Sequence, residues 1–173
     1  GIVGGRILDT EVEHLDHHRQ EPIGRILKNG GLTDNFDCDP EQIVEIDQMM
    51  GCNWAFQRDV FEQIGGYDEF LCRRSYQELD LCLRAKQMGL TVIFNPKLQI
   101  YHDMQPVNDH SGTLPNVRQF FLFRNLSYVY AKNIGPCTGF YLRFLLSYRT
   151  YLIACLQKPT PTHFKLGALT FAG

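Results

Sequence analysis

The stretch YQELDLCLRAKQMG, residues 76–89, constrains the fold more than any other part of the sequence. It has the pattern of an amphipathic helix, with Gly89 as a stop signal at its end. Apolar, strand-like residues 43–51 come before it, and further strand-like residues follow it up to His102. Strands that alternate with helices are typical of an α/β domain. We therefore expect a mixed α/β fold through residue 102 and a helical region after it.

The other expected elements follow from apolar periodicity and from Gly and Pro signals. They are a strand at 2–8, a polar loop at 10–42, a helix at 58–64 ended by Gly65 and Gly66, two strands around a turn at Asn95 and Pro96, a helix at 115–133, and an aromatic helix at 139–156. The chain thus divides into an α/β part, residues 1–112, and a helical extension, residues 113–173.

Composition narrows the classes of function. The chain has 173 residues, of which 44% are hydrophobic, and its net charge is -2. Because a nucleic-acid backbone needs clustered Lys and Arg, nucleic acid is not expected as the main partner. The six cysteines show no paired CxxC spacing, which indicates reduced thiols in a cytoplasmic protein.

Two carboxylates, Glu78 and Asp80, stand at the start of the central helix. One interpretation is structural, since Ser75 and Glu78 fit the S-x-x-E capping box and Asp80 would favour the helix dipole. The other is catalytic, because a glutamate whose pKa is raised by burial can act as a general base. The two roles oppose each other, as a helix N-terminus lowers a carboxylate pKa.

Several segments around these carboxylates occur in an order that is informative. They are QMMGCNWAF, RDVFEQIGGYDEF, ELDLCLRAKQMG, VIFNPKLQIYH and FFLFRNLSYVYAKN. In order and spacing they resemble the second half of the family 2 glycosyltransferases, which have a GT-A type fold. The resemblance covers residues 1–133, and residues 47–102 are its most specific part. It implies a partial GT-A-like α/β domain with a mixed sheet and a C-terminal helical extension.

The resemblance also implies roles for individual residues. Glu78 would be the catalytic base, and Gln77 replaces the first acid of the family's usual pair, which gives more weight to Asp80. His102 would be a ligand of a divalent metal, Mn²⁺ or Mg²⁺, on the nucleotide diphosphate. The ordinary alternative for His102 is a polar residue at the end of a strand.

The acceptor side would be formed by the loop before the helix. Trp54 offers an aromatic face for a sugar, although core packing is its ordinary role. Gly51 and Asn53 would let the backbone approach a ligand closely. Arg73 and Arg74 would contact the diphosphate, or else lie exposed in a flexible loop.

The family also needs a D-x-D motif at the end of a buried strand. Asp37 and Asp39 have this spacing, but they follow polar residues and are expected to lie in a loop turn. We therefore expect the nucleotide-binding half, with its D-x-D, to lie outside this chain. Such a chain alone would bind a sugar nucleotide weakly. Its first strand would lack its natural neighbours, and exposed strand edges would favour homo-oligomers.

Together these features predict a glycosyltransferase that moves a sugar, with inversion, from a nucleotide-sugar donor to a hydroxyl of a saccharide or lipid-linked acceptor. A retaining mechanism stays open at this point. The alternative from another class is a non-catalytic carbohydrate-binding or scaffolding module. The helix at 139–156 carries Arg143 and Arg149, and is either a docking helix or an interfacial helix on the inner face of the cell membrane.

Overall fold

The computed structural model describes residues 1–9, 22–71, 75–103 and 115–135, together with residues 145 and 149. Arg73, Arg74 and the polar segment 10–21 lie outside the described residues. So does the predicted helix at 139–156, apart from residues 145 and 149. None of the helices in the described part of the chain is long and apolar enough to cross a membrane.

The centre of the molecule is a mixed sheet of four strands in the order β2-β4-β1-β3. Strand β1 is Ile2–Asp9, and it pairs in parallel with β4, Val92–His102. The short strands β2, Val44–Glu45, and β3, Trp54–Phe56, pair antiparallel with β4 and β1 respectively. The predicted α/β class is confirmed. The sequence predicted that the first strand would lack neighbours and expose an edge. This prediction is wrong, because β1 pairs with a strand on each side.

Strand β4 is continuous where the sequence predicted two strands and a turn. Gly5 pairs with Asn95, and the next residue of β1, Arg6, pairs with Gln99, so residues 96–98 form a bulge opposite β1. A bulge bends the strand and increases its twist without ending the ladder. The predicted turn at Asn95 and Pro96 is therefore wrong, because β4 continues through a bulge at this point.

Close packing of two backbones fixes this bulge. A Cβ on Gly5 would collide with the carbonyl oxygen of Leu98, so only glycine fits there. The side-chain amide of Asn53 donates to the carbonyl of Arg6 at 2.8 Å and to that of Leu98 at 3.3 Å. The loop before β3 is thus bonded to both central strands.

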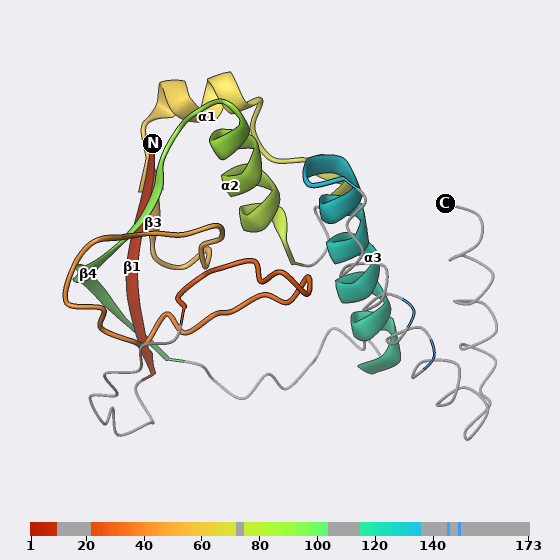
Figure 1. Cartoon of the computed structure of the whole chain (residues 1–173), viewed down its shortest axis with the longest axis horizontal. Coiled ribbons are helices and arrows are strands. Elements are labelled where there is room, and N and C mark those ends of the chain that lie inside the picture. The colour runs from red at the N-terminus through yellow and green to blue at the C-terminus, as the bar shows by residue number, and fades with distance from the viewer. Residues whose placement is uncertain (10–21, 72–74, 104–114, 136–144, 146–148, 150–173) are drawn as a thin grey trace.

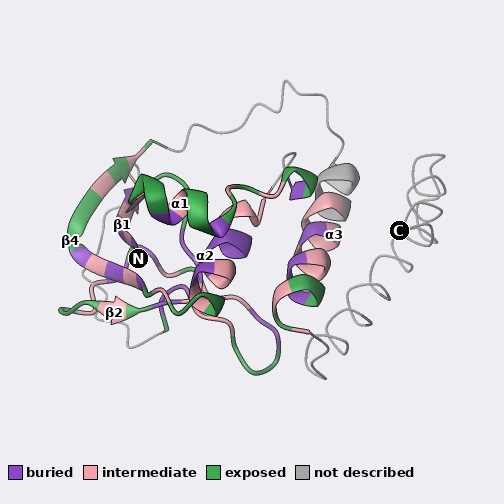
Figure 2. Ribbon diagram, turned by 90° about the horizontal axis from the view of Figure 1, so that it is seen from above, coloured by how far each residue is buried: buried purple, intermediate pink, exposed green. Residues whose placement is uncertain are grey.

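Helices form two layers on one side of the sheet (Figure 1). Helix α1 is Arg58–Ile64 and ends at Gly65 in the left-handed conformation, as the sequence predicted. After a 3-10 turn at Glu69–Leu71, helix α2 runs over Gln77–Gln87. Helix α3, Pro115–Asn133, has the predicted bounds. Both Figure 1 and Figure 2 show α2 between the sheet and α3.

Helix α2 is buried on two faces, where its sequence suggested a single apolar face. One face joins the core against the sheet, and the other joins a smaller core against α3 (Figure 2). The α2 residues in the first core are Leu81, Cys82 and Ala85, and the buried one in the second is Leu79. This double packing fixes the position of the first turn of α2, where the candidate carboxylates lie.

Candidate functional site

The start of α2 differs from the predicted capping box. The helix begins at Gln77, and its N-cap is Tyr76, which has φ 71° and makes no side-chain capping bond. Ser75 also has a positive φ, 81°. A capping serine needs an extended backbone one residue before the helix. Ser75 has neither the position nor the conformation, so the capping interpretation of Glu78 is wrong.

Glu78 instead lies against the loop that precedes β3. Its Oε1 atom packs so closely on Gly51 that a Cβ there would collide with it. The side chain is half-buried, and it makes no hydrogen bond or ion pair with any residue that the structure describes. The described part of the chain therefore leaves the hydrogen-bonding capacity of this carboxylate unused.

The charge of Glu78 is felt by neighbours on separate elements. Burial raises the pKa of the Tyr67 hydroxyl, and the nearby Glu78 charge raises it further. Burial also raises the pKa of the Cys52 thiol, with the Glu78 charge adding to the effect while a backbone hydrogen bond opposes it. On α2 itself, burial and then Glu78 raise the pKa of Cys82 to about 12. Glu78 is thus the common charged neighbour of these three groups.

Asp80 has a different environment from Glu78. Its side chain is fully buried (0% exposed), and Arg84 donates from Nε to Oδ2 at 2.8 Å. The Asn133 amide donates to Oδ1 at 2.8 Å, and the Lys132 ammonium lies 3.0 Å from the same oxygen. Both oxygens are occupied and no solvent reaches them. We therefore assign Asp80 a structural role in place of the predicted catalytic one.

Trp54 belongs to an aromatic cluster near Glu78. Its ring is half-buried, with centroids 4.9 Å from Phe56 and 6.3 Å from Tyr67. Phe61 stacks on Phe56 at 5.3 Å and meets Tyr67 edge-on at 5.4 Å. The ring thus packs on the core, as the ordinary interpretation predicted, and Tyr67 connects it to the surroundings of Glu78.

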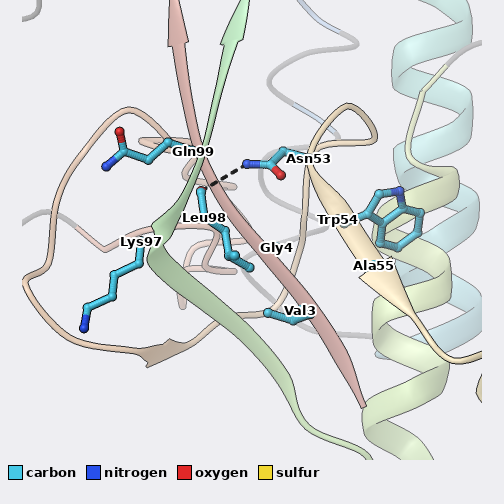
Figure 3. A pocket seen from close by; sticks show the side chains of 8 residues that line it. All are labelled: Val3, Gly4, Asn53, Trp54, Ala55, Lys97, Leu98 and Gln99. Atoms are coloured by element: carbon cyan, nitrogen blue, oxygen red, sulfur yellow. Dashed lines mark hydrogen bonds between the residues drawn. The ribbon is translucent and has the colours of Figure 1, made fainter.

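An open pocket of about 420 Å³ lies beside the loop that precedes β3 (Figure 3). It is lined by Val3, Gly4, Asn53, Trp54, Ala55, Lys97, Leu98 and Gln99. In Figure 3 the Trp54 ring points away from Lys97 and Gln99, so the ring is not a platform shared with those side chains. The lining contains no carboxylate. Asn53 reaches the pocket, but its amide is engaged by backbone carbonyls.

His102 ends β4 and pairs in register with Asp9 at the end of β1. Its Nδ1 atom is buried and has no hydrogen-bond partner among the residues that the structure describes. It makes no hydrogen bond or ion pair with Glu78. Among the described residues there is no group of three or more His, Cys, Asp or Glu side chains that could hold a metal. The metal role of His102 stays a prediction.

The Asp37–Asp39 motif lies in a loop, as predicted. Arg6 of β1 pairs with Asp39 at 3.2 Å and also donates to the carbonyl of Asp37. These contacts fasten the loop to the sheet. They give the motif a structural role in this chain.

Sequence reasoning missed the contribution of α3 to the site. Lys132 and Asn133 reach Asp80, and Asn125 donates to the carbonyl of Ser75 at 3.4 Å. No local pattern connects residues about fifty positions apart. Only the Asp80–Arg84 pair, with its one-turn helical spacing, carried a signal in the sequence.

Comparison with known proteins adds little to this geometry. No family model matches the chain. A stretch of 59 residues is 25% identical to the uncharacterized protein y4gI of Sinorhizobium fredii (strain NBRC 101917 / NGR234). That stretch is 34% of this chain and 6% of y4gI, so the chain spans a small part of that protein. The resemblance to family 2 glycosyltransferases therefore stays a prediction from the sequence.

Proposed function

We propose that this chain is the acceptor side of an inverting glycosyltransferase and that Glu78 is its general base. The observation that carries the proposal is the contact between the Glu78 carboxylate and Gly51, at the start of α2. This carboxylate has no partner among the described residues, whereas the neighbouring Asp80 is fully engaged. A base must be free to accept a proton from its substrate.

In the proposed reaction, Glu78 removes the proton from an acceptor hydroxyl. The oxygen then attacks the anomeric carbon of a nucleotide sugar from the face opposite the diphosphate, and the bond from that carbon to the diphosphate oxygen breaks, so that the nucleoside diphosphate leaves. The Gly51 loop, together with Trp54 at the start of β3 and Tyr67, would hold the acceptor, a saccharide or a lipid-linked saccharide. Positioning of this kind supplies much of the rate enhancement in transfer reactions.

The described residues do not by themselves form a complete metal site. His102, whose buried Nδ1 has no hydrogen-bond partner in the described part of the chain, is the residue we predict to contribute one ligand to Mn²⁺ or Mg²⁺. Further ligands and the nucleotide-binding residues would come from outside the described residues.

A second candidate is a carbohydrate-binding module without catalysis. The observation in its favour is the open pocket beside Asn53 and Trp54, which has no carboxylate in its lining. A module of this kind would bind a saccharide there and leave it unchanged. Lys97 and Gln99 would be its polar contacts.

A transfer assay on the full-length gene product distinguishes the two. Nucleotide sugars are screened with Mn²⁺ and Mg²⁺, and turnover is compared between wild type and Glu78→Gln. Loss of a general base is expected to reduce the rate by roughly 100-fold or more. Glu69→Gln, which removes an exposed carboxylate from the nearby 3-10 turn, is the matched control and should keep full activity. Undiminished turnover in Glu78→Gln would remove Glu78 from the mechanism, and saccharide binding without turnover would favour the module.

A further inference from the structure

Helix α3 contacts the first turn of α2 on both sides of Glu78. On one side the Asn125 amide, which is 1% exposed, donates to the carbonyl of Ser75. On the other side the Asn133 amide donates to Asp80 at 2.8 Å. Glu78 lies between these two attachment points along the chain.

The turn that carries Glu78 needs external support. Ser75 and Tyr76 both have positive φ, 81° and 71°, in a region that residues with a Cβ rarely adopt. The N-cap residue Tyr76 makes no side-chain capping bond at this end of the helix. Strained backbone of this kind persists only where surrounding contacts fix it. The contacts from α3 supply that constraint.

Helix α3 is itself anchored to other parts of the fold. Tyr130 is 1% exposed, and its hydroxyl donates to the carbonyl of Gly30 at 3.0 Å. Lys132 pairs with Asp68 at 2.6 Å as well as with Asp80 at 3.0 Å. The Tyr128 hydroxyl donates to Asp68 at 2.9 Å. A helix attached in this way can hold the turn of α2 in one position.

We infer that Asn125, Lys132 and Asn133 are positioning residues, which hold the first turn of α2 so that the Glu78 carboxylate faces the Gly51 loop. The inference rests on the proposed function, because it concerns the proposed base. It deepens that function by naming a part of the chain outside the site that sets the geometry of the base. Asp80 is the residue through which Lys132 and Asn133 act.

The test uses Cys52 as a reporter of where Glu78 lies. Cys52 is exposed, and the negative charge of Glu78 helps to raise its pKa. The rate of iodoacetamide alkylation at Cys52 is measured against pH, with peptide mass spectrometry to separate this cysteine from the others. Four proteins are compared: wild type, Glu78→Gln, Asn133→Ala and the double variant. Ser127→Ala, which removes a bond within α3 itself, is the control and should match wild type.

The inference predicts that Glu78→Gln lowers the pKa of Cys52 and that Asn133→Ala lowers it as well, because Glu78 moves away. The double variant should then show no larger decrease than Glu78→Gln alone. A wild-type pKa in folded Asn133→Ala, or decreases that add in the double variant, would overturn the inference. If Asn133→Ala does not fold by circular dichroism, Lys132→Met takes its place. Failure of both to fold would also overturn it, since the contacts would then hold the whole fold.

Transfer activity provides a separate readout. In the full-length product, Asn133→Ala should lower kcat by up to about 100-fold, with a smaller effect on the KM for the acceptor. If wild type shows no transfer at all, the proposed function fails. The Cys52 comparison still decides whether α3 positions Glu78.

Discussion

The Glu78 side chain lies directly against Gly51, and the space between them leaves no room for a Cβ at position 51. Gly51 is not among the glycines with positive φ, so its backbone conformation is open to other residues. Close approach is therefore the reason for a glycine at this position. The contact joins the loop before β3 to the first turn of α2.

Substitution of Gly51 should change the position of the Glu78 carboxylate while leaving the stability of the fold almost unchanged. In Gly51→Ala the new methyl group would displace Glu78, whose far end can move at little cost. We expect the free energy of unfolding to change by less than about 1 kcal/mol, while transfer activity falls as strongly as in Glu78→Gln. Urea unfolding and the transfer assay measure the two effects. Full activity in Gly51→Ala would show that the position of Glu78 at this loop does not matter.

We expect the Asp80 carboxylate to stabilise the fold. Asp80→Asn leaves the Arg84 guanidinium and the Lys132 ammonium without the buried charge that they contact. Breaking a buried ion pair on one side costs roughly 3–5 kcal/mol, so we expect a loss of about that size in urea unfolding. Asp59→Asn, at an exposed position on α1, is the control and should cost about 0.5 kcal/mol or less. An Asp80→Asn protein as stable as wild type would overturn this structural role.

Asp68 should contribute to stability in a pH-dependent way. Burial acts to raise its pKa, but hydrogen bonds from Lys132, Tyr128 and the backbone of Phe70 outweigh it, and the pKa lies below the usual 3.8. A depressed carboxyl pKa stabilises the fold above the unfolded value, and this contribution is lost as pH falls through the folded value.

The comparison is between wild type and Asp68→Asn in urea unfolding from neutral pH down to acid pH. The difference in unfolding free energy should be largest near neutrality and shrink as the pH falls below about 4. In the protein that keeps Asp68, Lys132→Met should reduce the pH dependence of the unfolding free energy, because it removes one of the hydrogen bonds that lower the pKa of Asp68. A difference that is constant with pH would mean that the Asp68 charge is not stabilised by these contacts.

The sequence predicted those elements whose signals are local. The bounds of α3 follow from Pro115 at its start and apolar periodicity up to Asn133. The end of α1 follows from Gly65, which adopts the left-handed conformation that a C-terminal glycine favours. Each of these signals lies within a few residues of the feature that it specifies.

The failed predictions depend on contacts between distant residues. Ser75 looked like a capping residue, but α3 packs on this turn and the backbone takes a positive φ. Asn95 and Pro96 predicted a turn, but β1 pairs with β4 on both sides of the bulge and so keeps β4 continuous. Asp80 was predicted to be catalytic beside Glu78, but its contacts with Lys132 and Asn133 favour a structural role. Tertiary contacts overrode the local preference in each case.

Cysteine reactivity offers a direct check of the arrangement around α2. Cys38 and Cys82 are buried and Cys52 is exposed among the cysteines that the structure describes. Burial and the Glu78 charge raise the pKa of Cys82 to about 12, so it is a neutral thiol at ordinary pH. Because only the thiolate reacts, iodoacetamide at pH 8 should label Cys52 and spare Cys38 and Cys82 in the folded protein. Unfolding in urea should make all three react, which provides the control. Rapid labelling of Cys82 in the native state would show that α2 is not packed against the sheet, and the first turn with Glu78 would then not be fixed at the Gly51 loop.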